Sequence, residues 1–129
     1  LLKHKPEFLF EAAQSLSKTG QYEKANEYLE RAVLLSSDPM LYYVMAKNEQ
    51  CLGEYRQAEK HLLHAIDILP ERIYPYYLLM NLYTEPSYFQ PAKLKKAIDS
   101  VLTKKPKVES SAIKEMKEKA RSMLNNTSI

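Results

Sequence analysis

The sequence predicts an all-α fold built from stacked helix–turn–helix units. Its two glycines, Gly20 and Gly53, stand 33 residues apart, and each is followed two residues later by a tyrosine and five residues later by an alanine. A repeat of this length is typical of helical pairs that stack on their neighbours. Apolar residues recur at helical spacing between prolines, and glycine is too scarce for a β-rich fold with many tight turns. The pattern favours a binding scaffold.

Helical periodicity, together with the seven prolines, predicts seven helices. Asp38 is expected to cap the third, and Pro86 is expected to lie in a turn. Pro70 and Pro106 are expected to end helices. Four further prolines are expected in first turns, where a missing N–H costs no hydrogen bond: Pro6, Pro39, Pro75 and Pro91. The expected helices are 7–18, 22–36, 39–52, 55–69, 74–84, 91–103 and 109–124.

These helices group into three units and a final single helix within one domain, 1–129. Gly20 and Gly53 fall between paired helices, where a left-handed residue is needed. In the third unit a longer turn, 85–91, replaces the glycine turn, and the last helix has one apolar and one charged face, as an end cap requires. The expected divisions are repeat one 7–36, repeat two 39–69, a degenerate repeat three 74–104 and a capping helix 109–124.

Helix stacking should place a set of small and branched apolar residues in the core. The residues expected there are Ala25, Leu29, Ala32, Ala58, Leu62 and Ala65. Because such contacts are close, a bulky substitution at Ala58 should overpack the core and destabilise the fold.

Charge and cysteine content narrow the function classes. Residues 1–92 carry 9 basic and 12 acidic side chains, whereas residues 93–129 carry 10 basic and 4 acidic ones. The single cysteine, Cys51, excludes an internal disulfide. No apolar run approaches the roughly 20 residues that span a bilayer. Since the chain begins with Leu1 rather than methionine, we expect it to be a piece of a longer protein or a processed form.

These features resemble the tetratricopeptide repeat family, which combines small residues at helix contacts with a glycine turn, a following aromatic residue, further alanines and a proline. The resemblance covers about residues 7–105, and the spacing of 33 is one short of the family's usual period of about 34. It implies a right-handed α-solenoid that binds proteins or peptides without catalysis. The matching positions are Ala13, Gly20, Tyr22, Ala25 and Ala32 in repeat one, and Ala46, Gly53, Tyr55, Ala58, Ala65 and Pro70 in repeat two.

In that family the first helix of each unit usually lines a concave groove. Tyrosine and methionine suit an adaptable peptide-binding surface, although some of these side chains could instead belong to the core. The lysine and asparagine positions of the carboxylate clamp found in chaperone-binding members hold Phe10, Gln14 and Val44 here, which disfavours an acidic C-terminal tail as ligand. By repeat position the groove lining is Phe10, Gln14, Ser17, Tyr43, Lys47, Gln50, Tyr76, Met80 and Tyr83.

A second resemblance concerns the segments 70–83 and 105–110. They are similar to the C-terminal repeat regions of O-antigen ligase-like membrane proteins from Bacteroides-type bacteria, in which a multi-spanning domain precedes the repeats. This resemblance implies a soluble tail of a membrane glycan ligase or polymerase, and the basic C-terminal part favours the cytoplasmic face of the inner membrane over the periplasmic face. A free-standing adaptor unrelated to envelope glycans is the alternative, and self-association stays open.

Other chemistry has weak support in the sequence. His61 and His64 share a helix face with Asp67 nearby, but two imidazoles without a further cluster rarely hold a metal. Cys51 is expected near the C-terminal end of a helix, where the helix dipole does not activate a thiol. We expect no metal, cofactor or catalysis. A basic C-terminal run could meet anionic lipid headgroups or nucleic acid. A solvated face is expected instead, with the membrane reached only through the parent chain, because the lysines are spread over a helix and a loop and arginine is scarce. The run includes Lys93, Lys95, Lys96, Lys104, Lys105 and Lys107.

Overall fold

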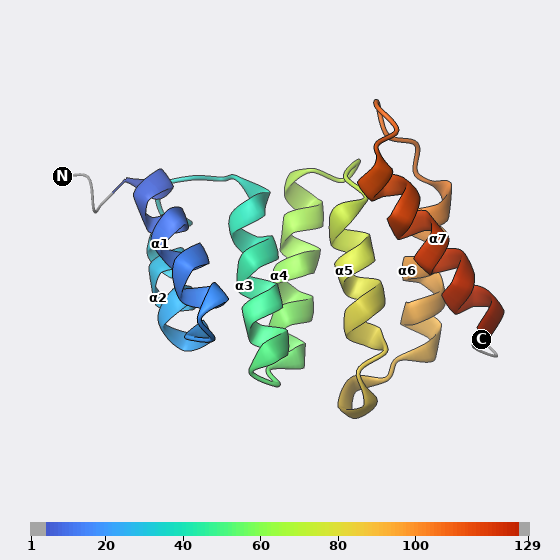
Figure 1. The fold of residues 1–129 in the computed structure, drawn as a ribbon, viewed down its shortest axis with the longest axis horizontal. Coiled ribbons are helices and arrows are strands. Elements are labelled where there is room, and N and C mark those ends of the chain that lie inside the picture. Colours follow the sequence, from blue (N-terminus) through green and yellow to red (C-terminus); the bar gives the residue numbers. More distant parts are fainter. Residues whose placement is uncertain (1–4, 127–129) are drawn as a thin grey trace. The chain divides into compact units, whose positions relative to one another are not determined.

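The computed structural model describes residues 5–126, which are shown in Figure 1. Over this range it contains seven α-helices, one short 3-10 helix and no strand. The elements are α1 (Pro6–Lys18), α2 (Tyr22–Ala32), α3 (Pro39–Cys51), α4 (Tyr55–Ile68), α5 (Tyr74–Tyr83), η2 (Pro86–Tyr88), α6 (Pro91–Thr103) and α7 (Ser111–Asn126). The all-α class and its helix–turn–helix units are therefore confirmed.

The helix starts follow the sequence signals. Asp38 caps α3, because its Oδ1 accepts a hydrogen bond from the backbone N–H of Met40 at 3.0 Å. Prolines occupy the first turns of α1, α3, α5 and α6, where a backbone N–H has no helical partner. Pro70 and Pro106 lie between helices, as expected.

The expected helix 22–36 is wrong at its C-terminal end, because α2 ends at Ala32. The next turn is tighter than an α-helix: Leu35 N–H donates to the carbonyl of Ala32 at 2.9 Å, three residues before it. Leu34 and Leu35 are 83% and 55% exposed, so a longer helix would gain no burial there. Pro39 also disfavours helical geometry at the residue before it.

The chain divides into two compact units, Leu1–Ile68 and Leu69–Ile129, which are called unit 1 and unit 2 here. Unit 1 holds α1 to α4, and unit 2 holds α5 to α7. The finer division into three repeats and a capping helix stays a prediction.

In unit 1, α1 packs on α2, α2 on α3, and α3 on α4. Small alanine side chains at these contacts let the helices approach closely. The six residues expected in the core, from Ala25 to Ala65, are all at most 2% exposed. One cluster joins the first three helices and consists of Leu9, Ala13, Ala25, Leu29, Ala32, Leu41 and Met45.

The turns between α1 and α2 and between α3 and α4 have the same geometry. Gly20 has a φ of 81° and Gly53 a φ of 78°, as the predicted left-handed residues require. In each turn the glycine N–H donates to the carbonyl three residues before it at 3.1 Å. The N–H of the next residue donates to the carbonyl five residues before it, which completes a Schellman motif and satisfies the last carbonyls of the helix.

Unit 2 joins α5 and α6 through η2 instead of a glycine turn, and α7 packs on both helices. The connection is closed by a hydrogen bond from Gln90 N–H to the carbonyl of Tyr83 at 3.3 Å. Ala120 is the buried residue of α7, and the side chains beside it are half-buried or exposed. The buried residues of α6 are Leu94, Ala97, Ile98 and Val101.

Candidate peptide-binding surface

Six of the nine predicted groove positions lie on α1 and α3, which contact each other within unit 1. Gln14 and Lys47 are exposed, and Phe10 and Gln50 are half-buried. Tyr43 is only 5% exposed, so most of its ring is unavailable to a ligand. The exposed and half-buried residues are the ones that can contact a peptide on this face.

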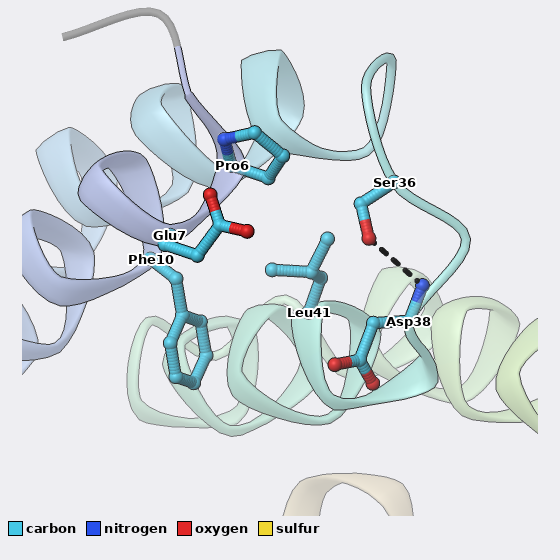
Figure 2. A pocket seen from close by; sticks show the side chains of 6 residues that line it. All are labelled: Pro6, Glu7, Phe10, Ser36, Asp38 and Leu41. Carbon is cyan, nitrogen blue, oxygen red and sulfur yellow. Dashed lines mark hydrogen bonds between the residues drawn. The ribbon is translucent and has the colours of Figure 1, made fainter. Parts of the chain in front are cut away.

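A small pocket lies between the start of α1 and the connection that leads into α3 (Figure 2). Its volume is about 130 Å³, well below the roughly 300–1,000 Å³ of small-molecule sites. It therefore suits part of one side chain better than a metabolite. The lining residues are Pro6, Glu7 and Phe10 from α1, Ser36 and Asp38 from the connection, and Leu41 from α3.

The lining of this pocket combines apolar and acidic groups. Figure 2 shows the Leu41 side chain between the carboxylates of Glu7 and Asp38, with the Phe10 ring on the side of Glu7. Ser36 Oγ accepts a hydrogen bond from Asp38 N–H at 3.2 Å, which fixes the connection. Such a lining fits a lysine or arginine side chain, whose apolar stem and cationic end need different surroundings.

Ser17, another predicted groove residue, belongs to a polar network inside unit 1. Its hydroxyl donates to Asn48 Oδ1 at 2.8 Å, and Asn48 Nδ2 donates to Asn26 Oδ1 at 2.8 Å. Asn26 Nδ2 in turn donates to the carbonyl of Met45 at 3.3 Å. Since Asn48 and Asn26 are 2% and 8% exposed, these bonds satisfy buried amides and tie α1, α2 and α3 together.

The sequence reasoning missed this network. Its signal was Asn26, an asparagine inside a helix and next to Ala25, at a position where interior helix residues are usually apolar or solvated.

The remaining groove positions lie on α5 of unit 2. Met80 and Tyr83 are 0% and 4% exposed, which agrees with the core alternative that the sequence left open. Tyr76 is half-buried, with the ammonium group of Lys104 5.0 Å from the centre of its ring. Of these three, only Tyr76 presents surface to a ligand.

The two histidines of α4 face α3 rather than a metal site. His61 Nδ1 lies 2.8 Å from Oε1 of Glu49, and the His64 ring packs edge-on against Tyr42 at 4.6 Å between centroids. Among residues 5–126, no three His, Cys, Asp or Glu side chains come close enough to hold a metal ion.

Cys51 is an exposed thiol at the end of α3, and it makes a hydrogen bond with Tyr22 at the start of α2. This hydrogen bond is the main reason why the pKa of Tyr22 lies above its ordinary value of 10.0; the charge of the Cys51 thiolate and burial act in the same direction. The contact connects two helix ends in unit 1.

Comparison with known families supports a repeat scaffold. Residues 6–39 match the family model described as tetratricopeptide repeat, a segment that covers α1, α2 and the first residue of α3. The curated proteins contain no match to this chain. Together with the all-helical fold, the match supports a tetratricopeptide repeat domain, a class that generally mediates protein–protein interactions and is typically non-catalytic. Within residues 5–126, no helix is both long and apolar enough to cross a membrane.

Proposed function

We propose that this chain is a non-catalytic scaffold that binds a protein or peptide on the α1–α3 face of unit 1. The observation that carries the proposal is the pocket that Glu7, Phe10, Asp38 and Leu41 line. It lies on the first helices of two successive helical pairs, where the family resemblance locates the ligand.

The pocket would hold a basic side chain of the partner. Its apolar stem would pack on Phe10 and Leu41, and its cationic end would approach the carboxylates of Glu7 and Asp38. Along the same face, exposed Gln14 and Lys47 offer polar groups to the backbone of an extended peptide. Ser17 supports this face from inside, through its bond to Asn48.

A random peptide library displayed on phage and selected on the purified chain tests this proposal. We expect enriched peptides to contain lysine or arginine beside apolar residues. Glu7→Lys should weaken their binding, whereas Glu11→Lys, an exposed position one turn along the same helix, should not. Equal binding to both variants, or enrichment without basic residues, contradicts the proposed pocket.

At a finer level, we propose that the chain is the soluble C-terminal domain of an O-antigen ligase- or polymerase-like membrane protein, at the cytoplasmic face of the inner membrane. The similarity of segments 70–83 and 105–110 supports this proposal, and a free-standing adaptor is the alternative. The genomic reading frame upstream of the codon for Leu1 separates them. Continuation into several hydrophobic spans supports the membrane protein, whereas a nearby start codon or secretion signal supports the adaptor.

A further inference from the structure

We propose that the α6–α7 end of unit 2 binds the anionic headgroups of a membrane surface. This function is separate from peptide binding on unit 1 and rests on different residues. From the sequence, anionic headgroups were the less favoured interpretation of the basic run and a solvated face was expected; the contacts around these lysines in the structure favour headgroups.

Three lysines at this end keep their positive charge. Lys104 and Lys119 lie over the rings of Tyr76 and Tyr77, with 5.0 and 5.6 Å between the ammonium nitrogen and the ring centre. Lys117 Nζ donates to the backbone carbonyl of Lys104 at 2.9 Å. None of these three lysines forms an ion pair with a carboxylate among residues 5–126. Rings and a carbonyl therefore hold the ammonium groups in place without neutralising them.

The α6–α7 connection projects from unit 2 and combines basic with apolar side chains. In Figure 1 this orange segment extends beyond the ends of α6 and α7. It carries exposed Lys105 and Lys107, and its Val108 is 74% exposed. Val108 follows Lys107 and precedes the exposed carboxylate of Glu109, so the loop carries one acidic side chain beside its basic ones. An apolar side chain next to lysines on a projecting loop is suited to the boundary between headgroups and acyl chains.

A membrane surface fits these features better than an acidic peptide does. A peptide would need a concave groove, whereas this segment is a protruding loop that can meet a flat surface. Lysine acts as a point charge suited to a diffuse negative surface, while arginine forks would indicate discrete phosphate or carboxylate ligands. The half-buried rings of Tyr76 and Tyr77 contact Lys104 and Lys119 at this end, and tyrosine is favoured at the membrane–water interface. The charge of residues 93–129 is also complementary, with 10 basic and 4 acidic side chains.

Binding through such a surface should be reversible and sensitive to salt. Each lysine close to an anionic surface raises the partition coefficient by about fivefold, and the attraction falls off within a Debye length. A single valine adds little, so charge should dominate.

Co-sedimentation of the full chain with vesicles tests the proposal. We expect the chain to pellet with vesicles of phosphatidylcholine and phosphatidylglycerol, but not with phosphatidylcholine alone, and to be released by added salt. The double variant Lys105→Glu/Lys107→Glu should lose this binding. The control Lys95→Glu/Lys96→Glu makes the same change in net charge at exposed positions of α6 and should lose much less.

Three outcomes would overturn the proposal: no sedimentation at low salt, equal loss in both double variants, or displacement from the vesicles by inorganic phosphate at low ionic strength. A further arm measures binding to polyglutamate, and preference for that polymer over the vesicles would indicate an acidic protein partner instead. Because peptide binding is tested at Glu7, either proposal can fail while the other stands.

Discussion

His61 Nδ1 lies 2.8 Å from Oε1 of Glu49, and this pair joins α4 to α3 in unit 1. Glu49 is only 5% exposed, so its carboxyl group has little access to water. A buried carboxyl group without a partner is costly, and the imidazole satisfies it. The histidine that the sequence offered as a weak metal ligand therefore has a structural role.

Removing this imidazole should destabilise unit 1. His61→Ala leaves the Glu49 carboxyl group without its partner, and we expect the free energy of unfolding to fall by about 1–3 kcal/mol. His64→Ala is the matched control, since His64 is exposed and its ring packs edge-on against Tyr42 without an ion pair to Glu49. Urea unfolding measured by circular dichroism compares the two; equal losses would show that the Glu49 contact contributes nothing specific.

The polar network of Ser17, Asn48 and Asn26 should contribute to the stability of unit 1. Asn48→Ala removes the Oδ1 that accepts from Ser17 and the Nδ2 that donates to Asn26. The buried Oδ1 of Asn26 then loses its partner. We expect a loss of about 1–3 kcal/mol in unfolding free energy. Gln14→Ala, at an exposed position of α1, should change it by less than about 0.5 kcal/mol. A denaturation midpoint for Asn48→Ala that equals that of the parent chain would contradict the structural importance of the network.

Packing around α4 makes a third prediction. Ala58 is 1% exposed, so Ala58→Phe must displace neighbouring side chains, and we expect it to cost roughly 1–3 kcal/mol. Gln57→Phe adds the same ring at the exposed neighbouring position and should have a much smaller effect. The check is the thermal midpoint of both variants, and an unchanged midpoint for Ala58→Phe would count against the helix packing.

The Tyr22–Cys51 contact predicts a pH dependence. Because the pKa of Tyr22 is raised above 10.0, the folded chain favours the neutral phenol more than the unfolded chain does. This contribution is fully present below the unfolded pKa and is lost as pH rises through the folded one. The difference in thermal midpoint between the parent chain and Tyr22→Phe should therefore hold up to pH about 9 and shrink as the pH rises from there to about 11. A difference that stays constant over that range contradicts the link.

The local features of the fold could be predicted from the sequence because they depend on residues close in the chain. Proline in a first turn, Asp38 as a cap and Gly20 after a helix act within a few residues of their own position. The end of α2 could not be predicted in this way. Leu34 continues the apolar pattern, but its side chain is 83% exposed in the structure. The pattern therefore predicted a helix longer than the one that forms.

The candidate site was predicted less completely, because side-chain burial depends on contacts between helices. Spacing predicted Phe10 as part of the groove, yet it could not show that Glu7 and Asp38 line the same small pocket as Phe10. It also grouped Tyr43 with exposed Lys47, since both share one helix face by spacing. Their exposure differs, because the Tyr43 side chain is buried by packing between helices whereas Lys47 reaches solvent.

The two glycine turns restrict which residues can replace Gly20 and Gly53. No heavy atom lies within 4 Å of the position where a Cβ would stand at Gly20 or Gly53. The restriction at these positions is therefore one of handedness and not of room, because only the positive φ excludes an ordinary L-residue. D-alanine prefers positive φ and so suits this backbone conformation, and it would hold the unfolded chain to fewer conformations than glycine does.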